Sequence, residues 1–240
     1  MTIGILILAG GLGKRMSSDV PKVLHKINNK SLLEHVIETA IKLNPDKIGI
    51  ILGKYRDIIQ ENLKKNLKTE LLNKIEYIYQ KEALGTGHAV ICGIEFIKKY
   101  EKILILSGDV PLITVETLTK LINLTDNCAI LVNSIENPYG YGRIKYLESN
   151  KIKIIEEKDA THEEKEIKEI NSGIYCFESN NLIKNLPKLN CNNSQNEYYL
   201  TDLISLYDNI NVLKSKNNNE ILGVNDIKQL EQLEKLFLDY

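Results

Sequence analysis

A group of glycines and cations follows the first apolar segment of the chain, residues 3–7. Glycine lets backbone N–H groups approach an anion, and cations close behind supply charge where a polyphosphate would lie. The pattern predicts a loop that holds a nucleotide or a sugar phosphate; an ordinary glycine turn with solvated cations is the alternative. The group consists of Gly10, Gly11, Gly13, Lys14, Arg15 and Lys22.

The glycine spacing matches neither standard phosphate-binding signature. A Walker A loop needs Ser or Thr after Gly-Lys, and Gly13-Lys14 is followed here by Arg15. The dinucleotide fingerprint needs a third glycine where Met16 stands. The predicted phosphate loop therefore belongs to neither of these two classes.

Two further segments place glycine beside a polar side chain at the end of an apolar run. Asp109 follows Gly108 and suits a magnesium ion held on substrate phosphates, although turn and helix-capping aspartates are commoner. Gln80 precedes Gly85 and Thr86, and its amide can both donate to and accept from a nucleobase. Thr86 also suits a helix cap. We expect His88 to pack or cap rather than act as a base.

The second half offers groups suited to sugar hydroxyls. Gly142 ends an aromatic-glycine loop, which is equally typical of a hairpin turn, and Glu156 and Asn171 lie at predicted strand ends. The acidic run around Glu156 is more often a solvated face. Asn225 suits the N-cap of the last helix, and a role as a second metal ligand requires the chain to return to the first loop.

The elements that position these residues alternate between strands and helices, which predicts an α/β fold. The chain order favours a doubly wound, mainly parallel sheet, with ligands beyond the carboxyl ends of the strands. Ser31 and Glu34 form a capping box for the first helix. The predicted strands are 3–8, 47–52, 75–79 and 102–106, and the predicted helices are 31–43, 55–65 and 87–99.

After about residue 127 the apolar runs become shorter, which predicts a smaller, partly antiparallel sugar-binding lobe. We divide the single predicted domain into a nucleotide-binding half (1–126), a sugar-binding half (127–225) and a closing helix (226–240). The predicted strands are 128–134, 142–147, 152–156 and 172–177, and the predicted helices are 199–208 and 226–238.

Composition narrows the class of protein. A net charge of −1 argues against a nucleic-acid partner, and no apolar run is long enough to span a membrane. The four cysteines form no C-x-x-C pair or compact framework, which favours reduced thiols. With no room for a signal peptide before the first strand, we expect a cytoplasmic protein.

Taken in order, the motifs resemble the uridyltransferase (pyrophosphorylase) domain of the bacterial bifunctional N-acetylglucosamine-1-phosphate uridyltransferase family, within the sugar nucleotidyltransferases. The resemblance spans nearly the whole chain. The glycine loop specifies only the superfamily, whereas segments 158–161 and 197–199 are more specific to the N-acetylglucosamine branch. It implies the Rossmann-like fold of nucleotide-diphospho-sugar transferases. The family continues into a β-helix acetyltransferase, so we expect that activity to be absent here and a monomer or dimer rather than the family trimer.

By position, the resemblance implies four sets of site residues: catalytic cations, metal ligands, uridine contacts and sugar contacts. Arg15 and Lys22 would face the triphosphate as catalytic cations, Gly108 would lie beside the nucleotide, and Asp109 and Asn225 would bind Mg²⁺. Gly10 and Ser107 depart from the family, which usually has alanine and an aromatic there; Ser107 could loosen packing beside the nucleotide. The implied uridine set is Leu8, Ala9, Gly10, Gly11, Gln80, Gly85 and Thr86, and the implied sugar set is Gly142, Glu156 and Asn171.

The implied reaction joins UTP and N-acetylglucosamine 1-phosphate to give UDP-N-acetylglucosamine and pyrophosphate. It proceeds by in-line attack without a covalent intermediate and needs no general base. Two alternatives stay open at this point: the same chemistry with another sugar phosphate, such as glucose 1-phosphate, or with another nucleotide, and a catalytically silent UDP-sugar-binding regulator.

Overall fold

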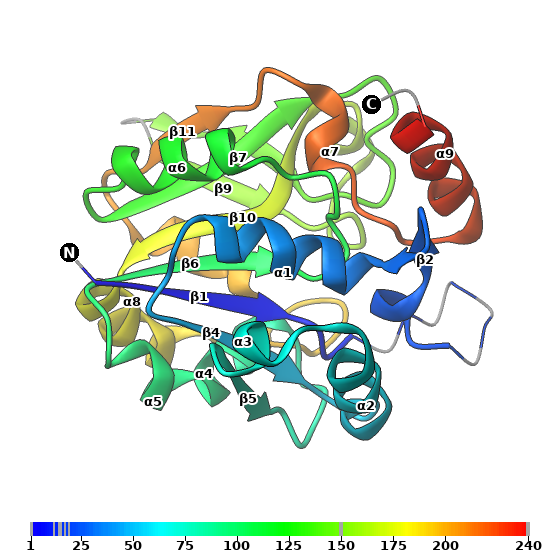
Figure 1. Ribbon diagram of the computed structural model, residues 1–240. Coiled ribbons are helices and arrows are strands. Elements are labelled where there is room, and N and C mark those ends of the chain that lie inside the picture. Colours follow the sequence, from blue (N-terminus) through cyan, green and yellow to red (C-terminus); the bar gives the residue numbers. More distant parts are fainter. Residues whose placement is uncertain are drawn as a thin grey trace.

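One mixed, mainly parallel sheet forms the centre of the molecule. The computed structural model describes residues 2–11, 13, 16, 18, 20–148 and 151–238 (Figure 1). Within them the sheet order is β11-β7-β10-β6-β1-β4-β5, with β8 paired to β10 and β9 paired to β8. Strand β10 runs antiparallel between β6 and β7, whereas the pairs β6–β1, β1–β4, β4–β5 and β7–β11 are parallel. The predicted fold class is confirmed.

The strands form where the apolar runs lie. Residues Ile5, Leu6 and Ile7 of β1 are fully buried, as expected for a strand covered on both faces. The strands are β1 (Ile3–Leu8), β4 (Lys47–Leu52), β5 (Ile75–Tyr79), β6 (Lys102–Ser107), β7 (Cys128–Ser134), β8 (Arg143–Tyr146), β9 (Ile152–Ile155), β10 (Glu169–Glu178) and β11 (Asn211–Lys214), with a small separate hairpin of β2 (Lys26–Ile27) and β3 (Lys30–Ser31).

Helices cover both faces of the sheet (Figure 1). Helices α1, α2 and α6 pack on one face, and α4, α5 and α8 pack with a 3₁₀ segment, η5, on the other. The α-helices are α1 (Leu32–Lys42), α2 (Arg56–Asn66), α3 (Thr69–Leu72), α4 (Thr86–Cys92), α5 (Ile94–Ile97), α6 (Val115–Leu124), α7 (His162–Lys165), α8 (Ser179–Asn185) and α9 (Ile227–Leu238). The 3₁₀ helices are η2 (Lys22–Leu24), η4 (Leu186–Lys188), η5 (Leu200–Leu206) and η6 (Asn218–Ile221). None of the helices described here is long and apolar enough to cross a membrane.

The predicted start of α1 is confirmed in atomic detail. Ser31 Oγ accepts from the Glu34 backbone N–H at 3.2 Å, and Glu34 Oε2 accepts from the Ser31 N–H at 2.7 Å. This capping box satisfies two donors that the first helical turn leaves unpaired. Helix α1 follows directly on the β2–β3 hairpin, so the cap fixes the junction between the hairpin and the helix.

Two predicted helices are wrong in form. The predicted helix 87–99 is interrupted at Gly93, which ends α4 and precedes α5. The predicted helix 199–208 is the 3₁₀ segment η5, in which Leu200 and Leu203, three residues apart, are both buried. Helices α6 and α8 and the edge strand β11 were not predicted; α8 and β11 are short and carry few periodic residues. The division into two halves and a closing helix stays a prediction.

Helix α9 closes the structure over the first loop. Leu233 packs with Met16, Ile27, Leu32 and Val224 in a small apolar cluster of its own. Figure 1 shows α9 beside β2, so the last helix lies against the segment that follows the glycine loop.

Candidate functional site

Three loops meet at the carboxyl ends of β1, β4 and β5. The Gly10 loop follows β1, Gly53 follows β4 and Gln80 follows β5. A Cβ added at Gly10 would lie 3.2 Å from both Gln80 Oε1 and Gly53 N, and one at Gly53 would lie 2.7 Å from Gly10 O. The two glycines therefore permit a close approach of backbone and amide that larger residues would obstruct. Gly53 was missed in the sequence, although a glycine directly after a buried strand was the available signal.

The remaining residues of the first loop line the same edge. Ala9 donates its N–H to Ile51 O at 2.9 Å and is buried, while Gly11 is exposed. Leu8 O accepts from Gly108 N at 3.0 Å, which joins the ends of β1 and β6. Arg15 lies outside the described residues, as do Leu12 and Lys14.

Gln80 is held by groups from its own loop and from α4. Its Nε2 lies 2.9 Å from Gly85 O and 3.2 Å from His88 Nδ1, and the residue is 7% exposed. Gly85 has φ of +104°, and an added Cβ would lie 2.5 Å from Tyr198 O. Glycine is therefore required at this position by conformation and by space.

Thr86 does not cap α4, contrary to one interpretation of the sequence. The N-cap residue is Gly85, which has no side chain, and Thr86 Oγ1 accepts from Leu200 N at 3.0 Å. The Gly87 N–H also donates to Tyr198 O at 2.7 Å. The loop before α4 is thus joined to the segment that begins η5.

Lys22 and Asp109 form an ion pair at the adjoining strand end. Lys22 Nζ lies 2.5 Å from Asp109 Oδ2, and the two side chains are 18% and 16% exposed. Gly13, with φ of +58°, makes room for Lys22, since an added Cβ would lie 2.9 Å from Lys22 Cβ. The structure thus joins the predicted cation and carboxylate.

The segment before α9 returns to Asp109. Val224 N donates to Asp109 O at 3.1 Å, one residue before Asn225. Asn225 is not the N-cap, contrary to the simpler interpretation, because Asp226 Oδ1 accepts from Gln229 N at 2.9 Å instead. None of the hydrogen bonds recorded for the described residues uses the Asn225 side-chain amide, whose oxygen therefore stays available.

Tyr141 connects this segment to the predicted sugar loop. Its hydroxyl accepts from Gly223 N at 3.2 Å and donates to Gly223 O at 3.5 Å. Burial raises the pKa of Tyr141 to about 12, so the hydroxyl stays protonated and able to donate. The sequence singled out this loop but not this contact.

The predicted sugar residues occupy adjoining strand ends. Asn171 N donates to Gly142 O at 2.9 Å, and a Cβ added at Gly142 would lie 2.9 Å from Ile154 Cγ2. Glu156, directly after β9, accepts from the Thr201 hydroxyl at 2.9 Å. Burial raises the pKa of the Glu156 carboxyl, and the nearby carboxylates of Asp202, Asp159 and Glu197 raise it further, against the lowering effect of the Thr201 hydrogen bond.

Asn171 and Ser107 hold the strand that carries the sugar side. The Asn171 amide donates from Nδ2 to the Tyr175 hydroxyl at 2.7 Å. Ser107 Oγ donates to Gly173 O at 3.2 Å, and a Cβ added at Gly173 would lie 2.7 Å from Ser107 Oγ. The hydroxyl thus joins β6 to β10, whereas the sequence suggested only looser packing at Ser107.

A buried ion pair fixes the loop that contains Gly140 and Gly142. Arg143 is fully buried, its Nη2 lies 2.7 Å from Glu157 Oε2, and its Nη1 donates to Tyr141 O. Glu157 Oε2 also accepts from Gly140 N at 3.1 Å. The pair was missed because a Tyr-Gly-Tyr-Gly-Arg run and an acidic run look like a turn and a solvated face.

The oxygen donors at Asp109 and Asn225 suit Mg²⁺, which favours carboxylates, carbonyls and phosphate oxygens. Among the described residues there is no cluster of three or more His, Cys, Asp or Glu able to hold a metal. No recorded hydrogen bond from the described residues reaches Asp109 Oδ1. The donor set therefore fits an ion that takes one or two protein oxygens and completes its shell with substrate phosphates and water.

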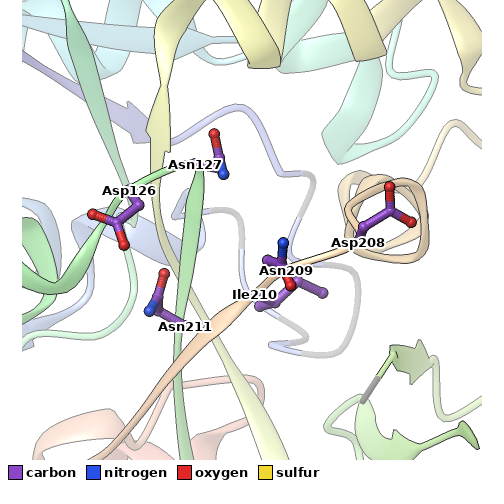
Figure 2. Close-up of a pocket in the computed structure, with 6 residues that line it drawn as sticks. All are labelled: Asp126, Asn127, Asp208, Asn209, Ile210 and Asn211. Atoms are coloured by element: carbon purple, nitrogen blue, oxygen red, sulfur yellow. The ribbon is translucent and has the colours of Figure 1, made fainter. Parts of the chain in front are cut away.

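A separate hollow lies at the other end of the sheet. Figure 2 shows the polar side chains around it, at the amino ends of β7 and β11. Asn127 accepts there from the Asn181 amide at 2.8 Å, and Asp208 pairs with Lys151 at 3.1 Å. The hollow holds none of the predicted site residues. Its lining is Asp126, Asn127, Asp208, Asn209, Ile210 and Asn211.

Comparison with known proteins identifies the family. The model of the family described as nucleotidyl transferase matches residues 5–221. The chain belongs to the nucleotidyl transferase family. This nucleotidyltransferase is 46% identical over 234 residues to the "Bifunctional protein GlmU" of Thermosipho melanesiensis, covering 96% of this chain and 49% of that protein. It is 43% identical over 244 residues to the GlmU of Francisella tularensis subsp. novicida, covering 99% and 52%. The chain spans about half the length of these relatives, and the resemblance predicted from its motifs is confirmed.

Solved structures support the same fold for this nucleotidyltransferase. A UDP-glucose pyrophosphorylase complexed with UDP-glucose superimposes with a TM-score of 0.76 at 19% identity, covering 100% of this chain and 99% of that one. A putative glucose-1-phosphate thymidylyltransferase from Bacillus anthracis gives a TM-score of 0.73 at 18% identity, covering 100% and 96%. At these identities the likeness extends to the fold alone.

Proposed function

We propose that this nucleotidyltransferase transfers a uridylyl group from UTP to N-acetylglucosamine 1-phosphate and releases pyrophosphate. The observation that carries the proposal is the continuity of the site: Asp109 pairs with Lys22, binds the segment of Asn225, and connects through Tyr141 to the loop of Gly142. A nucleotide phosphate and a sugar phosphate held by these groups would meet at one ion pair. The identity to GlmU proteins supports this choice of substrates.

The proposal assigns residues by the part of the substrates they would contact. Lys22, with Arg15 of the same loop, would neutralise the triphosphate as the two catalytic cations, and Asp109 and Asn225 would hold Mg²⁺. The nucleotide contacts would come from Leu8, Ala9, Gly10, Gly11, Gln80, Gly85, Thr86 and Gly108, and the sugar contacts from Gly142, Glu156 and Asn171.

The chemistry asks for charge neutralisation and alignment. A phosphomonoester has a second pKa of about 6, so the sugar phosphate oxygen is an anionic nucleophile at neutral pH without a base. It would attack the α-phosphorus in line, and the bond to the β-phosphate oxygen would break. Lys22 would stabilise the charge that develops on the departing pyrophosphate, and Mg²⁺ would supply Lewis-acid neutralisation of the phosphate oxygens.

The test is release of pyrophosphate from UTP in the presence of Mg²⁺. We expect rapid release with N-acetylglucosamine 1-phosphate and much slower release with glucose 1-phosphate. Faster turnover of glucose 1-phosphate would replace the sugar in this proposal. Binding of UDP-sugar without any pyrophosphate release would instead indicate a silent regulator.

Two further properties belong to the proposal. Its partners would be the small-molecule substrates alone, drawn from the nucleotide pool of the cytoplasm, where we propose that it acts. We propose a monomer or dimer, and size-exclusion chromatography with light scattering measures the mass directly.

A further inference from the structure

The amide of Gln80 has only one chemically consistent orientation. A carbonyl oxygen can only accept a hydrogen bond, so the atom 2.9 Å from Gly85 O must be the amide nitrogen, Nε2. The same nitrogen lies 3.2 Å from His88 Nδ1. Both hydrogens of Nε2 therefore have acceptors, provided that the histidine presents a lone pair at Nδ1.

The environment of His88 favours that tautomer. The Gln80 nitrogen carries hydrogens, so a proton on the facing Nδ1 would oppose them, and the ring proton therefore belongs on Nε2. Cys92 Sγ lies 4.0 Å from Nδ1 and 3.9 Å from Nε2 and does not distinguish the two nitrogens. The imidazole also lies beside the Tyr198 ring, with centroids 6.4 Å apart.

The amide oxygen is left for a ligand. Among the described residues, no donor forms a hydrogen bond with Gln80 Oε1. This oxygen is also not among the fully buried polar atoms that lack a partner, so a ligand can reach it. It lies beside Gly10, where an added Cβ would be 3.2 Å away. Because Gly10 has no side chain, the space beside this oxygen stays open.

We propose that His88 is a positioning residue that locks the Gln80 amide with its oxygen toward the nucleotide base. The site then selects a base edge that offers an N–H donor, as the N3–H of uracil or thymine does, over cytosine, whose N3 is an acceptor. This inference rests on the proposed nucleotide site and adds the device that sets its base preference. Without the histidine acceptor, the amide is held by Gly85 O alone.

Two variants of His88 separate hydrogen bonding from packing. His88→Asn keeps an acceptor near the place of Nδ1 and loses the ring, whereas His88→Phe keeps the ring against Tyr198 and loses the acceptor. Calorimetric binding of UDP and CDP to the full chain gives the base preference without turnover. Thermal unfolding of both variants, compared with the wild type, checks that each is folded.

We expect the wild type and His88→Asn to prefer UDP, and His88→Phe to lose about tenfold of that preference, the value of one hydrogen bond. In pyrophosphate release, His88→Phe should raise the KM for UTP with kcat nearly unchanged. A His88→Phe protein that keeps the full preference, or a His88→Asn protein that loses it, overturns the role of His88. A wild type that binds neither diphosphate overturns the proposed function itself.

Discussion

At the scale of single residues, the Lys22–Asp109 pair should govern the rate. Asp109→Asn removes the carboxylate charge at constant size, and Lys22→Ala removes the cation, so each should lower turnover by on the order of 100-fold or more. The measurement is pyrophosphate release at saturating UTP and Mg²⁺.

Chelation of Mg²⁺ with EDTA should abolish release by the wild type, and added Mg²⁺ should restore it.

A second ion pair provides the matched control. Lys30 Nζ and Glu38 Oε1 are 2.7 Å apart, but their side chains are 48% and 37% exposed and lie in the β2–β3 hairpin and α1. Lys30→Ala should leave the rate unchanged and the stability within about 1 kcal/mol of wild type. An Asp109→Asn protein as fast as Lys30→Ala would remove Asp109 from the mechanism.

Glu156 should trade stability for sugar binding. Because burial raises its folded-state pKa above that of the unfolded chain, its favourable contribution is complete at low pH and is lost as pH rises through the folded pKa. Glu156→Gln keeps an acceptor for Thr201 and avoids the buried charge. The variant should melt above the wild type at pH 7, with the difference vanishing near pH 4, and should show a higher KM for the sugar phosphate. A lower melting temperature at pH 7 would contradict this assignment.

At the scale of elements, the Arg143–Glu157 pair joins the start of β8 to the segment that follows β9. Arg143→Met removes a buried cation. Glu157, whose side chain is 20% exposed, then has no partner for its charge, and we expect the free energy of unfolding to fall by about 3 kcal/mol. Urea unfolding measures that cost, and the double variant with Glu157→Gln should recover most of it. Equal stability of the single and double variants would mean that the ion pair contributes little.

The positions of strands and helices could be predicted from the sequence where an element's own residues carry the signal for it. The apolar runs of β1, β4 and β7 and the Ser31 cap were predicted because burial and capping are local. The 3₁₀ form of η5 was not, because it depends on the distant bonds of Thr86 and Gly87 to residues 198–200.

The candidate site divides in the same way. Asp109 and Gln80 were found from glycine-polar turns, and the roles of most other site residues came from the resemblance. Two contacts of the site could not be predicted: the hydrogen bond between Tyr141 and Gly223, and the one between the side chains of Gln80 and His88. No local sequence pattern indicates which of these atoms come together, because that depends on the folded structure.

At the scale of the whole molecule, the two predicted halves share the two larger hydrophobic clusters, one on each face of the sheet. Ile5 and Cys176 belong to one core, and Leu6 and Tyr175 belong to the other. If one half unfolded, it would expose apolar residues of the other half to water. We therefore expect one cooperative unfolding transition. Far-UV circular dichroism and tyrosine fluorescence should give the same midpoint in urea. UDP-N-acetylglucosamine should raise that midpoint by mass action, and two separated transitions would contradict the shared cores.

Because β10 pairs with strands that precede it in the chain, β6 and β7 are synthesised before their shared partner. Strand β6 leaves the ribosome some sixty residues before β10, its partner on one side, and β7 likewise waits for β10. Until residue 178 emerges, the nascent sheet exposes an unpaired, wholly apolar edge at residues 103–106. Such an edge recruits other strands, so the interval between these two segments is when the growing chain most needs a chaperone.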